Sequence, residues 1–202
     1  MYIVGIDEAG RGPLAGLVSV GMVKMVNPTS QELRGASKKF FKGIKDSKKL
    51  SLEKREEWYG LAVEARKRGE LDFHVALISE KVIDKQGISY AIRLGIARCL
   101  KALGVSPQDL IFLDGSLKAP VEFRNQQTII KGDEKIPVIS LASICAKVTR
   151  DRKMVALAKK FPRYGFDVHK GYGTSAHLAA LRKYGKTALH RSTFLKNLTK
   201  SG

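Results

Sequence analysis

Three apolar, strand-like runs of this chain each lead into acidic residues, and this pattern limits the possible folds more than any other feature. The runs are YIVGI before Asp7 and Glu8, LIFL before Asp114, and QTII shortly before Asp133. Strands that end on acids can bring those acids together at one edge of a sheet. Because crowded carboxylates repel one another unless a divalent cation neutralises them, the pattern predicts a metal site at that edge.

The chemistry of the carboxylates indicates which ion would bind. Their oxygens are hard ligands, which select Mg²⁺ or Mn²⁺, and these ions readily share their coordination shell with substrate phosphates. Two such ions about 4 Å apart would hold both the attacking water and the leaving oxygen of a phosphodiester. The alternative interpretation is a set of solvated acids that pair with nearby lysines.

The net charge indicates a polyanionic partner. The 202 residues include 37 Lys and Arg against 19 Asp and Glu, which gives a formal charge of +18. Basic surfaces release counterions from phosphates and steer association with nucleic acid. Charge alone does not separate a nuclease from a non-catalytic nucleic-acid-binding protein.

The cysteines and the hydropathy pattern favour a cytoplasmic protein. Cys99 and Cys145 have no metal-like spacing, so we expect buried free thiols in a reducing compartment. No run approaches the roughly 18 apolar residues of a membrane helix, and the first residues lack the features of a signal peptide. We therefore expect a cytoplasmic monomer with no membrane partner.

The spacing of apolar residues predicts an α/β fold with a mixed sheet flanked by helices. Strands are expected at 2–6, 17–26, 73–77, 110–113 and 127–130, and a long polar loop at 27–50. Helices are expected after the N-cap Ser51, over 88–103, over about 140–160, from Thr174 to about Tyr184, and as a turn or two in the tail. No linker or repeat divides the chain, so we expect one domain over 1–202, with 161–202 as a helical C-terminal extension.

The glycines after the first strand have two interpretations. The spacing Gly10-x-Gly12-x-x-Ala15 fits a dinucleotide-binding fingerprint, which must open a helix and be followed by an acid about 20 residues later. Here the next segment is β-like and no acid closes it by Asn27, so this interpretation is rejected. The remaining use of Gly10 and Gly12 is close approach of the backbone to a ligand beside Asp7.

Several longer stretches together resemble one enzyme family. The chain resembles type 2 ribonuclease H, of the bacterial ribonuclease HII kind, in the order and spacing of GIDEAGRGP, DSKKLS, LDG, KGDEKIPVISLASICAKVTRDR and YGFDVHKGYGTSAHLAALRKYG…HRSTF. The resemblance runs from about Ile3 to Phe194. It implies a ribonuclease H-like fold and hydrolysis, dependent on Mg²⁺ or Mn²⁺, of the RNA strand of RNA–DNA hybrids. It also implies incision 5′ of ribonucleotides embedded in duplex DNA, which leaves 3′-hydroxyl and 5′-phosphate ends.

The same resemblance implies roles for single acids. Asp7, Glu8 and Asp114 match metal-binding catalytic acids of the family. The fourth catalytic acid matches Asp133 in Lys-Gly-Asp, and Asp151 in Thr-Arg-Asp is the competing candidate.

The resemblance also implies substrate contacts. Gly10, Arg11 and Gly12 match the motif that touches the 2′-hydroxyl of the ribonucleotide, and Tyr172 matches the tyrosine that stacks on the sugar of the next nucleotide. The loop that carries Tyr172 would make 161–202 a substrate-contacting segment as well as a helical extension.

Basic residues predict contacts with phosphates. Lys48 and Lys49 lie just before a helix N-terminus, where phosphates bind readily, although a solvated loop is the alternative. His169 and Lys170 share a loop with Tyr172, and we expect both to contact the DNA backbone.

Two further expectations concern the helix at 140–160 and the histidines. Arg150 and Arg152 are expected to form a helix face that meets phosphates. The four histidines, at positions 74, 169, 177 and 190, have no convincing metal-ligand spacing.

Two rival functions stay open from the sequence. One is a basic nucleic-acid-binding protein whose acids serve only in ion pairs. The other is type 3 ribonuclease H, which carries an additional domain before its first catalytic strand. Because the strand here begins at Tyr2, the type 2 form is expected.

Overall fold

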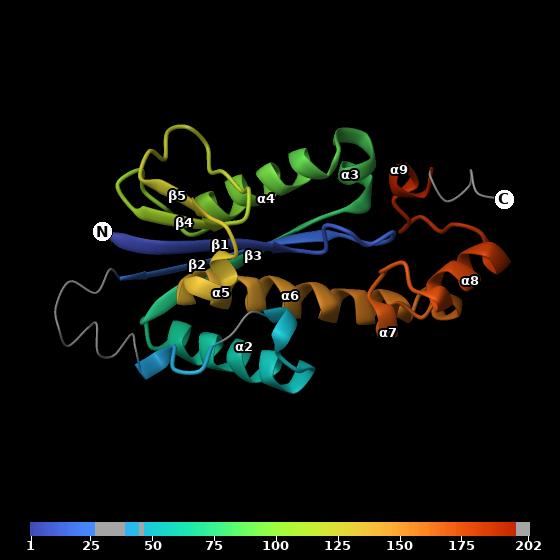
Figure 1. The fold of residues 1–202 in the computed structure, drawn as a ribbon, viewed down its shortest axis with the longest axis horizontal. Helices are drawn as coiled ribbons and strands as arrows, with labels where there is room; N and C mark the ends of the chain where they lie inside the picture. Colours follow the sequence, from blue (N-terminus) through green and yellow to red (C-terminus); the bar gives the residue numbers. More distant parts are fainter. Residues whose placement is uncertain (27–38, 45–46, 197–202) are drawn as a thin grey trace.

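A five-stranded mixed sheet forms the centre of the molecule in a computed structural model, which describes residues 1–26, 39–44 and 47–196 (Figure 1). The strand order is β3-β2-β1-β4-β5. β2 pairs antiparallel with β1 and β3, whereas β4 pairs in parallel with β1 and β5. The strands are β1 Tyr2–Ala9, β2 Val18–Val26, β3 Leu71–Ile78, β4 Leu110–Asp114 and β5 Gln126–Ile129. The predicted strands and the predicted fold class are confirmed.

The expected helices are all present, and several short helices occur where none was expected. In the described residues they are η1 Ser47–Lys49, α2 Leu52–Lys67, α3 Glu80–Gln86, α4 Ile88–Ala102, α5 Gly132–Lys135, α6 Pro137–Ala158, η2 Pro162–Tyr164, α7 Phe166–His169, α8 Ser175–Tyr184 and α9 Ser192–Leu195. α3, α5, α7, η1 and η2 were not expected, because helices of seven or fewer residues are too short to show a clear apolar period. α6 begins earlier than expected, at Pro137, whose fixed φ suits the first turn of a helix. Much of the loop expected at 27–50 lies outside the described residues.

Two predicted N-caps are confirmed. The Ser51 hydroxyl accepts a hydrogen bond from the Lys54 amide at the start of α2. The Thr174 hydroxyl accepts one from the His177 amide at the start of α8. Each cap satisfies an amide that has no partner within its own helix.

Helices cover both faces of the sheet (Figure 1). Alternate residues of β1 point to opposite faces: Val4 and Ile6 join the core under α4, and Ile3 packs with the core under α6 and α2. The sheet is therefore the middle layer of three. Its order β2-β1-β4 places the ends of β1 and β4 side by side.

Two strand glycines let α6 lie close to the sheet. A Cβ at Gly5 would stand 2.4 Å from the Val138 carbonyl oxygen, and one at Gly21 would stand 2.3 Å from that of Ala142. These distances exclude a side chain at either position without a shift of α6. The close contact holds α6 directly against β1 and β2.

Both cysteines are buried free thiols, as expected. Burial raises the pKa of Cys99 to about 11 and that of Cys145 to about 12. Neither thiol is ionised at neutral pH, so both act as small apolar side chains of the core. Within the described residues, no helix has the length and apolar character needed to cross a membrane.

Candidate active site and nucleic-acid interface

Three of the predicted acids meet at one edge of the sheet. Asp7, Asp114 and Asp133 each offer a carboxylate oxygen, and these oxygens lie within 4.8 Å of one another. Asp7 lies near the end of β1, Asp114 ends the parallel strand β4, and Asp133 lies in α5 after β5. Parallel pairing brings the carboxyl ends of these strands to the same edge, as the sequence pattern predicted.

Backbone hydrogen bonds fix the positions of these acids. The Asp7 carboxylate accepts from the Glu8 amide at 2.7 Å, and the Asp114 carboxylate accepts from the Gly132 amide at 2.6 Å. The carbonyl oxygen of Asp133 accepts from the Ser140 hydroxyl of α6 at 2.6 Å. These three residues, Asp7, Asp114 and Asp133, are called the acidic cluster below. The backbone itself and α6 hold the acidic cluster in place.

The electrostatics of the acidic cluster fit a divalent cation. Burial raises the pKa of Asp7 well above its usual range; the neighbouring charges of Glu8 and Asp114 raise it further, and a hydrogen bond with Ser143 partly opposes this. Among the side chains that the structure describes, no lysine or arginine forms an ion pair with Asp7 or Asp114. An all-oxygen donor set, in which Asp7 and Asp114 have no cationic partner among the described residues, suits Mg²⁺ or Mn²⁺.

The other two candidate acids lie outside this group of three. Successive residues of a strand point to opposite faces, so Glu8 points away from Asp7, and its carboxylate pairs with Arg11 at 3.3 Å. Asp151 accepts two hydrogen bonds from the Lys147 ammonium, at 2.7 and 2.9 Å. The geometry therefore groups Asp133, and not Asp151, with Asp7 and Asp114.

The glycine turn after β1 lies next to the acidic cluster. Gly10 has φ +90°, and a Cβ there would stand 2.0 Å from the Arg150 guanidinium. A Cβ at Gly12 would meet nothing within 4 Å, so the space beside its backbone is open. The Arg11 side chain is half-exposed. Gly10 is thus needed by the fold, whereas Gly12 leaves room for a ligand.

Two buried arginines hold this turn, and their roles differ from the sequence prediction. Arg150 is fully buried and donates to the carbonyl oxygens of Leu17 and Lys170, both at 3.0 Å. The expectation that Arg150 meets phosphates is therefore wrong, because its guanidinium is used inside the protein. Arg152 is exposed and pairs with Glu56 of α2.

The second buried arginine, Arg191, was not singled out from the sequence. Its guanidinium donates to four carbonyl oxygens, those of Gly10, Arg11, Gly16 and Leu17, at 2.7 to 3.1 Å. Burial, with a contribution from the charge of Arg150, lowers its pKa to about 9, so it stays protonated at neutral pH. No pattern in the sequence indicated this role, because contacts across 174 or more positions leave no local period.

The loop that carries Tyr172 packs against the same turn. The Gly171 carbonyl oxygen accepts from the amides of Leu14 and Ala15, at 2.9 and 3.3 Å. The Tyr172 ring is 41% exposed and lies within 6 Å of the cations of Lys147 and Arg150. One face of the ring is therefore supported by α6, while the rest is open to a ligand.

His169 and Lys170 bond mainly within their own loop. The ring nitrogens of His169 bond the Tyr164 carbonyl oxygen at 2.6 Å and the Gly171 amide at 3.2 Å. The Lys170 ammonium donates to the carbonyl oxygen of Asp167. Both residues shape the loop around Tyr172.

Three histidines that lack a recognisable spacing in the sequence meet in the C-terminal part of the fold. The rings of His169 and His177 stack at 4.4 Å, and Nε2 of His177 lies 3.1 Å from Nε2 of His190. Nδ1 of His177 donates to the Tyr172 carbonyl oxygen, so Nε2 of the same ring is an acceptor. It accepts a hydrogen bond from Nε2 of His190. Nδ1 of His190 in turn accepts from the Thr187 amide. Every ring nitrogen of His177 and His190 is thus used to hold the loop.

The lysines of DSKKLS lie in η1. Lys49 is exposed and pairs with Glu134 of α5 at 3.0 Å, and the side chain of Lys48 lies outside the described part of the structure. The preceding Ser47 shares a hydrogen bond with Ser143 of α6 at 2.8 Å. Because the Ser143 side chain also acts on Asp7, whose pKa it lowers, this contact joins η1 to the acidic cluster.

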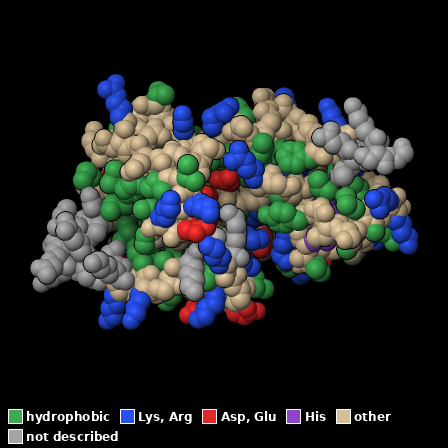
Figure 2. Space-filling model, in the orientation of Figure 1, with side chains coloured by type: hydrophobic (Ala, Val, Ile, Leu, Met, Phe, Trp, Pro, Cys, Tyr) green, Lys and Arg blue, Asp and Glu red, His purple; other side chains and the backbone are tan. Residues whose placement is uncertain are grey.

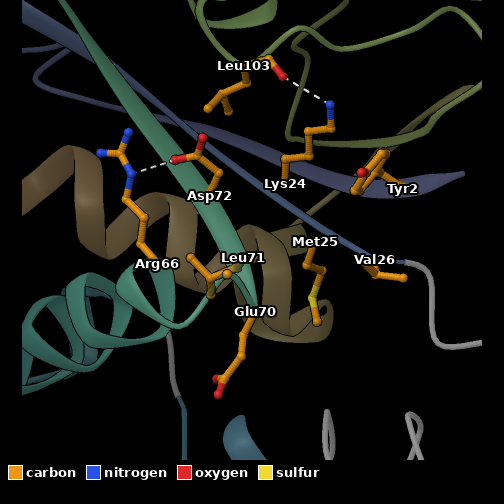
Figure 3. A pocket seen from close by; sticks show the side chains of 10 residues that line it. Tyr2, Lys24, Met25, Val26, Arg66, Glu70, Leu71, Asp72 and Leu103 are labelled. Atoms are coloured by element: carbon orange, nitrogen blue, oxygen red, sulfur yellow. Dashed lines mark hydrogen bonds and ion pairs between the residues drawn. The ribbon is translucent and has the colours of Figure 1, made fainter.

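The surface charge and the cavities also favour the acidic cluster as the functional site. On the face shown in Figure 2, basic side chains are spread widely and acidic ones are fewer. A separate cavity of about 360 Å³ lies at the other end of β1, around Tyr2 and Lys24 (Figure 3). The charged side chains that line this cavity already have partners in the protein, since Lys24 donates to the Leu103 carbonyl oxygen and Arg66 pairs with Asp72. The acidic cluster is therefore the better candidate for chemistry.

Comparisons with known proteins agree with this geometry. A family model described as Ribonuclease HII matches residues 4–197. The chain is 42% identical to a ribonuclease HII of Caldicellulosiruptor bescii over 197 residues, which cover 98% of this chain and 88% of that protein.

Solved structures show the same fold. The structure of a PCNA:RNase HII complex from Archaeoglobus fulgidus matches with a TM-score of 0.72 and 27% identity, over 95% of this chain and 94% of that one. A structure of Bst-RNase HIII in complex with Mn²⁺ matches with a TM-score of 0.67 and 17% identity, over 99% of this chain and 68% of that one. At this identity the second likeness concerns the fold alone.

Proposed function

The chain belongs to the ribonuclease HII family, and from this premise we propose that it incises duplex DNA on the 5′ side of embedded ribonucleotides. Membership makes it an endoribonuclease of the ribonuclease H type, which acts on the RNA strand of RNA–DNA hybrids. A purely non-catalytic role does not agree with this assignment. The products of the proposed reaction carry 3′-hydroxyl and 5′-phosphate ends.

The observation that carries the proposal is the meeting of Asp7, Asp114 and Asp133 beside the Gly10–Gly12 turn. When bound there, Mg²⁺ or Mn²⁺ would activate water and stabilise the charge that develops at the scissile phosphate. Asp7, Glu8 and Asp114 are the proposed ligands, and Asp133 completes the four catalytic acids. To bind a metal ion, Glu8 would have to break its ion pair with Arg11. This pair lies at the surface and is therefore weak.

The residues around the cluster would orient the substrate. The backbone of Gly10, Arg11 and Gly12 would read the 2′-hydroxyl, the feature that distinguishes RNA from DNA. Tyr172 would stack on the sugar of the next nucleotide. Lys48, Lys49, His169 and Lys170 would contact backbone phosphates, which fix position without reading sequence. In this proposal, the segment 161–202 contributes one side of the substrate groove.

One experiment tests the proposal. The protein is incubated with duplex DNA that carries a single ribonucleotide, in Mg²⁺, in Mn²⁺ or in EDTA, and the product ends are mapped. Incision 5′ of the ribonucleotide, with a 3′-hydroxyl and only with metal, is the expected result. Cleavage of continuous RNA–DNA hybrids without cleavage at the single ribonucleotide would reject the finer proposal and keep the family activity.

A further inference from the structure

A cleft on the α4 face of the sheet adjoins the acidic cluster and has not been assigned above. It has a volume of about 240 Å³. Three cations and two hydroxyls line it above an apolar floor: Arg11, Arg93, Lys118, Ser89 and Ser116 over Ile92, Ile96 and Leu117. We call this the cationic cleft. Three segments far apart in sequence form it: the Gly10–Gly12 turn, α4, and the residues after β4.

Two of the three positive charges of the cationic cleft are not balanced by the protein. No Asp or Glu is among the residues that line it. Within the described part of the chain, Arg93, Lys118, Ser89 and Ser116 form no hydrogen bond or ion pair through their side chains. Arg11 has one partner, Glu8, at 3.3 Å on the surface. Three cations around one small space repel one another, and an anion would relieve this repulsion.

The start of α4 adds to the positive potential. Ser89 lies in the first turn of this 15-residue helix, and Arg93 follows one turn later on the same side. The N-cap is Gly87, which makes no side-chain hydrogen bond to the first amides of the helix. The amides of a helix N-terminus favour anions, and here they occur together with free cations and hydroxyls in one cleft.

The cationic cleft and Tyr172 lie on different faces of the sheet. The cleft is built on α4, whereas the Tyr172 ring lies near Lys147 and Arg150 of α6, on the other face of the sheet. The segment that follows the acids of β1 connects them, because Arg11 lines the cleft while the amides of Leu14 and Ala15 bond the loop of Tyr172. A strand that contacts Tyr172 and crosses the acidic cluster would therefore continue into the cationic cleft.

We propose that the cationic cleft binds a backbone phosphate of the cleaved strand on the 5′ side of the ribonucleotide. The assignment of the cleft to the 5′ side rests on the proposed function, in which Tyr172 contacts the nucleotide on the 3′ side of the ribonucleotide. Arg93 and Lys118 supply the charge, Ser89 and Ser116 supply hydroxyl donors, and the apolar floor gives no sequence preference. The cleft thus adds an anchor upstream of the cleavage site.

The test removes the two free cations, in the double variant Arg93→Ala/Lys118→Ala. The matched control is Arg98→Ala/Lys101→Ala, which removes two exposed cations from α4 outside the cleft. The dissociation constant for a duplex with one ribonucleotide is measured against NaCl concentration, in EDTA so that no cleavage occurs. The same measurement is repeated with the ribonucleotide strand truncated directly 5′ of the ribonucleotide, and separately shortly 3′ of it.

We expect the double variant to bind the full duplex about three- to tenfold more weakly than the control, and to lower the slope of log K against log salt by about 0.9 per lost contact. The difference should vanish for the 5′-truncated strand and persist for the 3′-truncated strand. Equal binding of variant and control, or a difference that follows the 3′ side, would overturn the proposal. Wild-type cleavage in Mg²⁺ tests the proposed function separately, because these binding measurements need no turnover.

Discussion

The guanidinium of Arg191 donates to the carbonyl oxygen of Gly10 at 2.7 Å, although 181 positions separate the two residues. The same group binds three further carbonyl oxygens of residues 11–17. A residue from the C-terminal part of the chain thus fixes the backbone turn that adjoins the acidic cluster. The orientation of this turn depends on tertiary contacts as much as on its glycines.

Replacing Arg191 with lysine should destabilise the protein. A lysine keeps the charge but has only three N–H donors on one nitrogen, so it leaves at least one of the four carbonyl oxygens unsatisfied. Bonds to charged groups contribute about 1.5–3 kcal/mol each, so we expect a loss of at least about 1.5 kcal/mol in the free energy of unfolding. Urea denaturation measures it. The exposed control Arg182→Lys should change stability by less than about 0.5 kcal/mol, and a similar small effect for Arg191→Lys would contradict this role.

Substitution of the acidic cluster should remove cleavage and keep binding. Asp7→Asn or Asp114→Asn deletes a proposed metal ligand and also a negative charge that faces the nucleic acid, so affinity for a duplex should stay equal or rise. Metal binding is read independently from the rise in melting temperature on adding Mn²⁺, which the variants should lose. The exposed control Glu122→Gln should keep both properties. Full activity of Asp7→Asn would disprove the proposed mechanism.

The lysines of DSKKLS should act through charge alone. The double variant Lys48→Ala/Lys49→Ala should weaken binding to a similar degree for all duplex sequences and lower the salt slope by about 0.9 per lost phosphate contact. The control Lys67→Ala/Arg68→Ala removes two exposed cations at the end of α2. If both double variants leave the salt slope unchanged, Lys48 and Lys49 lie off the interface.

The buried histidine pair should make the protein sensitive to acid. Burial and the neighbouring His177 lower the pKa of His190 from 6.5 to about 4. The unfolded chain therefore binds more protons, so stability is complete above about pH 6.5 and falls as the pH decreases towards 4, by at most about 3 kcal/mol from this residue. Urea denaturation at pH 7 and pH 5 should show a smaller difference for His190→Gln than for wild type. The exposed control His74→Asn should keep the wild-type difference.

The sequence predicted those features of the fold that depend on local patterns. The acids at the ends of β1 and β4 follow apolar runs, and parallel pairing then brings them together. Arg150 was misread because a cation on a helix resembles a surface residue until its burial against carbonyl groups is known. Arg191 and the contacting histidines were missed for a related reason, since their partners come from distant segments and have no fixed spacing.

The proposed recognition of a single ribonucleotide depends on the ring of Tyr172. The Tyr172 ring is partly exposed, and no hydrogen bond of its hydroxyl occurs among the described residues. Its flat face can therefore stack on the sugar of the nucleotide after the ribonucleotide, where a 2′-hydroxyl would crowd against the ring. Tyr172→Ala should lower cleavage at a lone ribonucleotide roughly 5- to 150-fold, the equivalent of a stacking contact of about 1–3 kcal/mol. Cleavage within a continuous RNA strand should fall much less.

The matched control is Tyr172→Phe, which keeps the ring and removes only the hydroxyl, and we expect it to cleave both substrates at near wild-type rates. A purely structural role for Tyr172 would give a different result. The ring lies against Lys147 and Arg150, so its loss could loosen the loop. Cleavage of both substrates by Tyr172→Ala would then fall equally, and its melting temperature would decrease. Rates on the two substrates, measured with the melting temperature of each variant, distinguish the outcomes: a selective loss at unchanged stability supports recognition of the junction, and equal losses with reduced stability reject it.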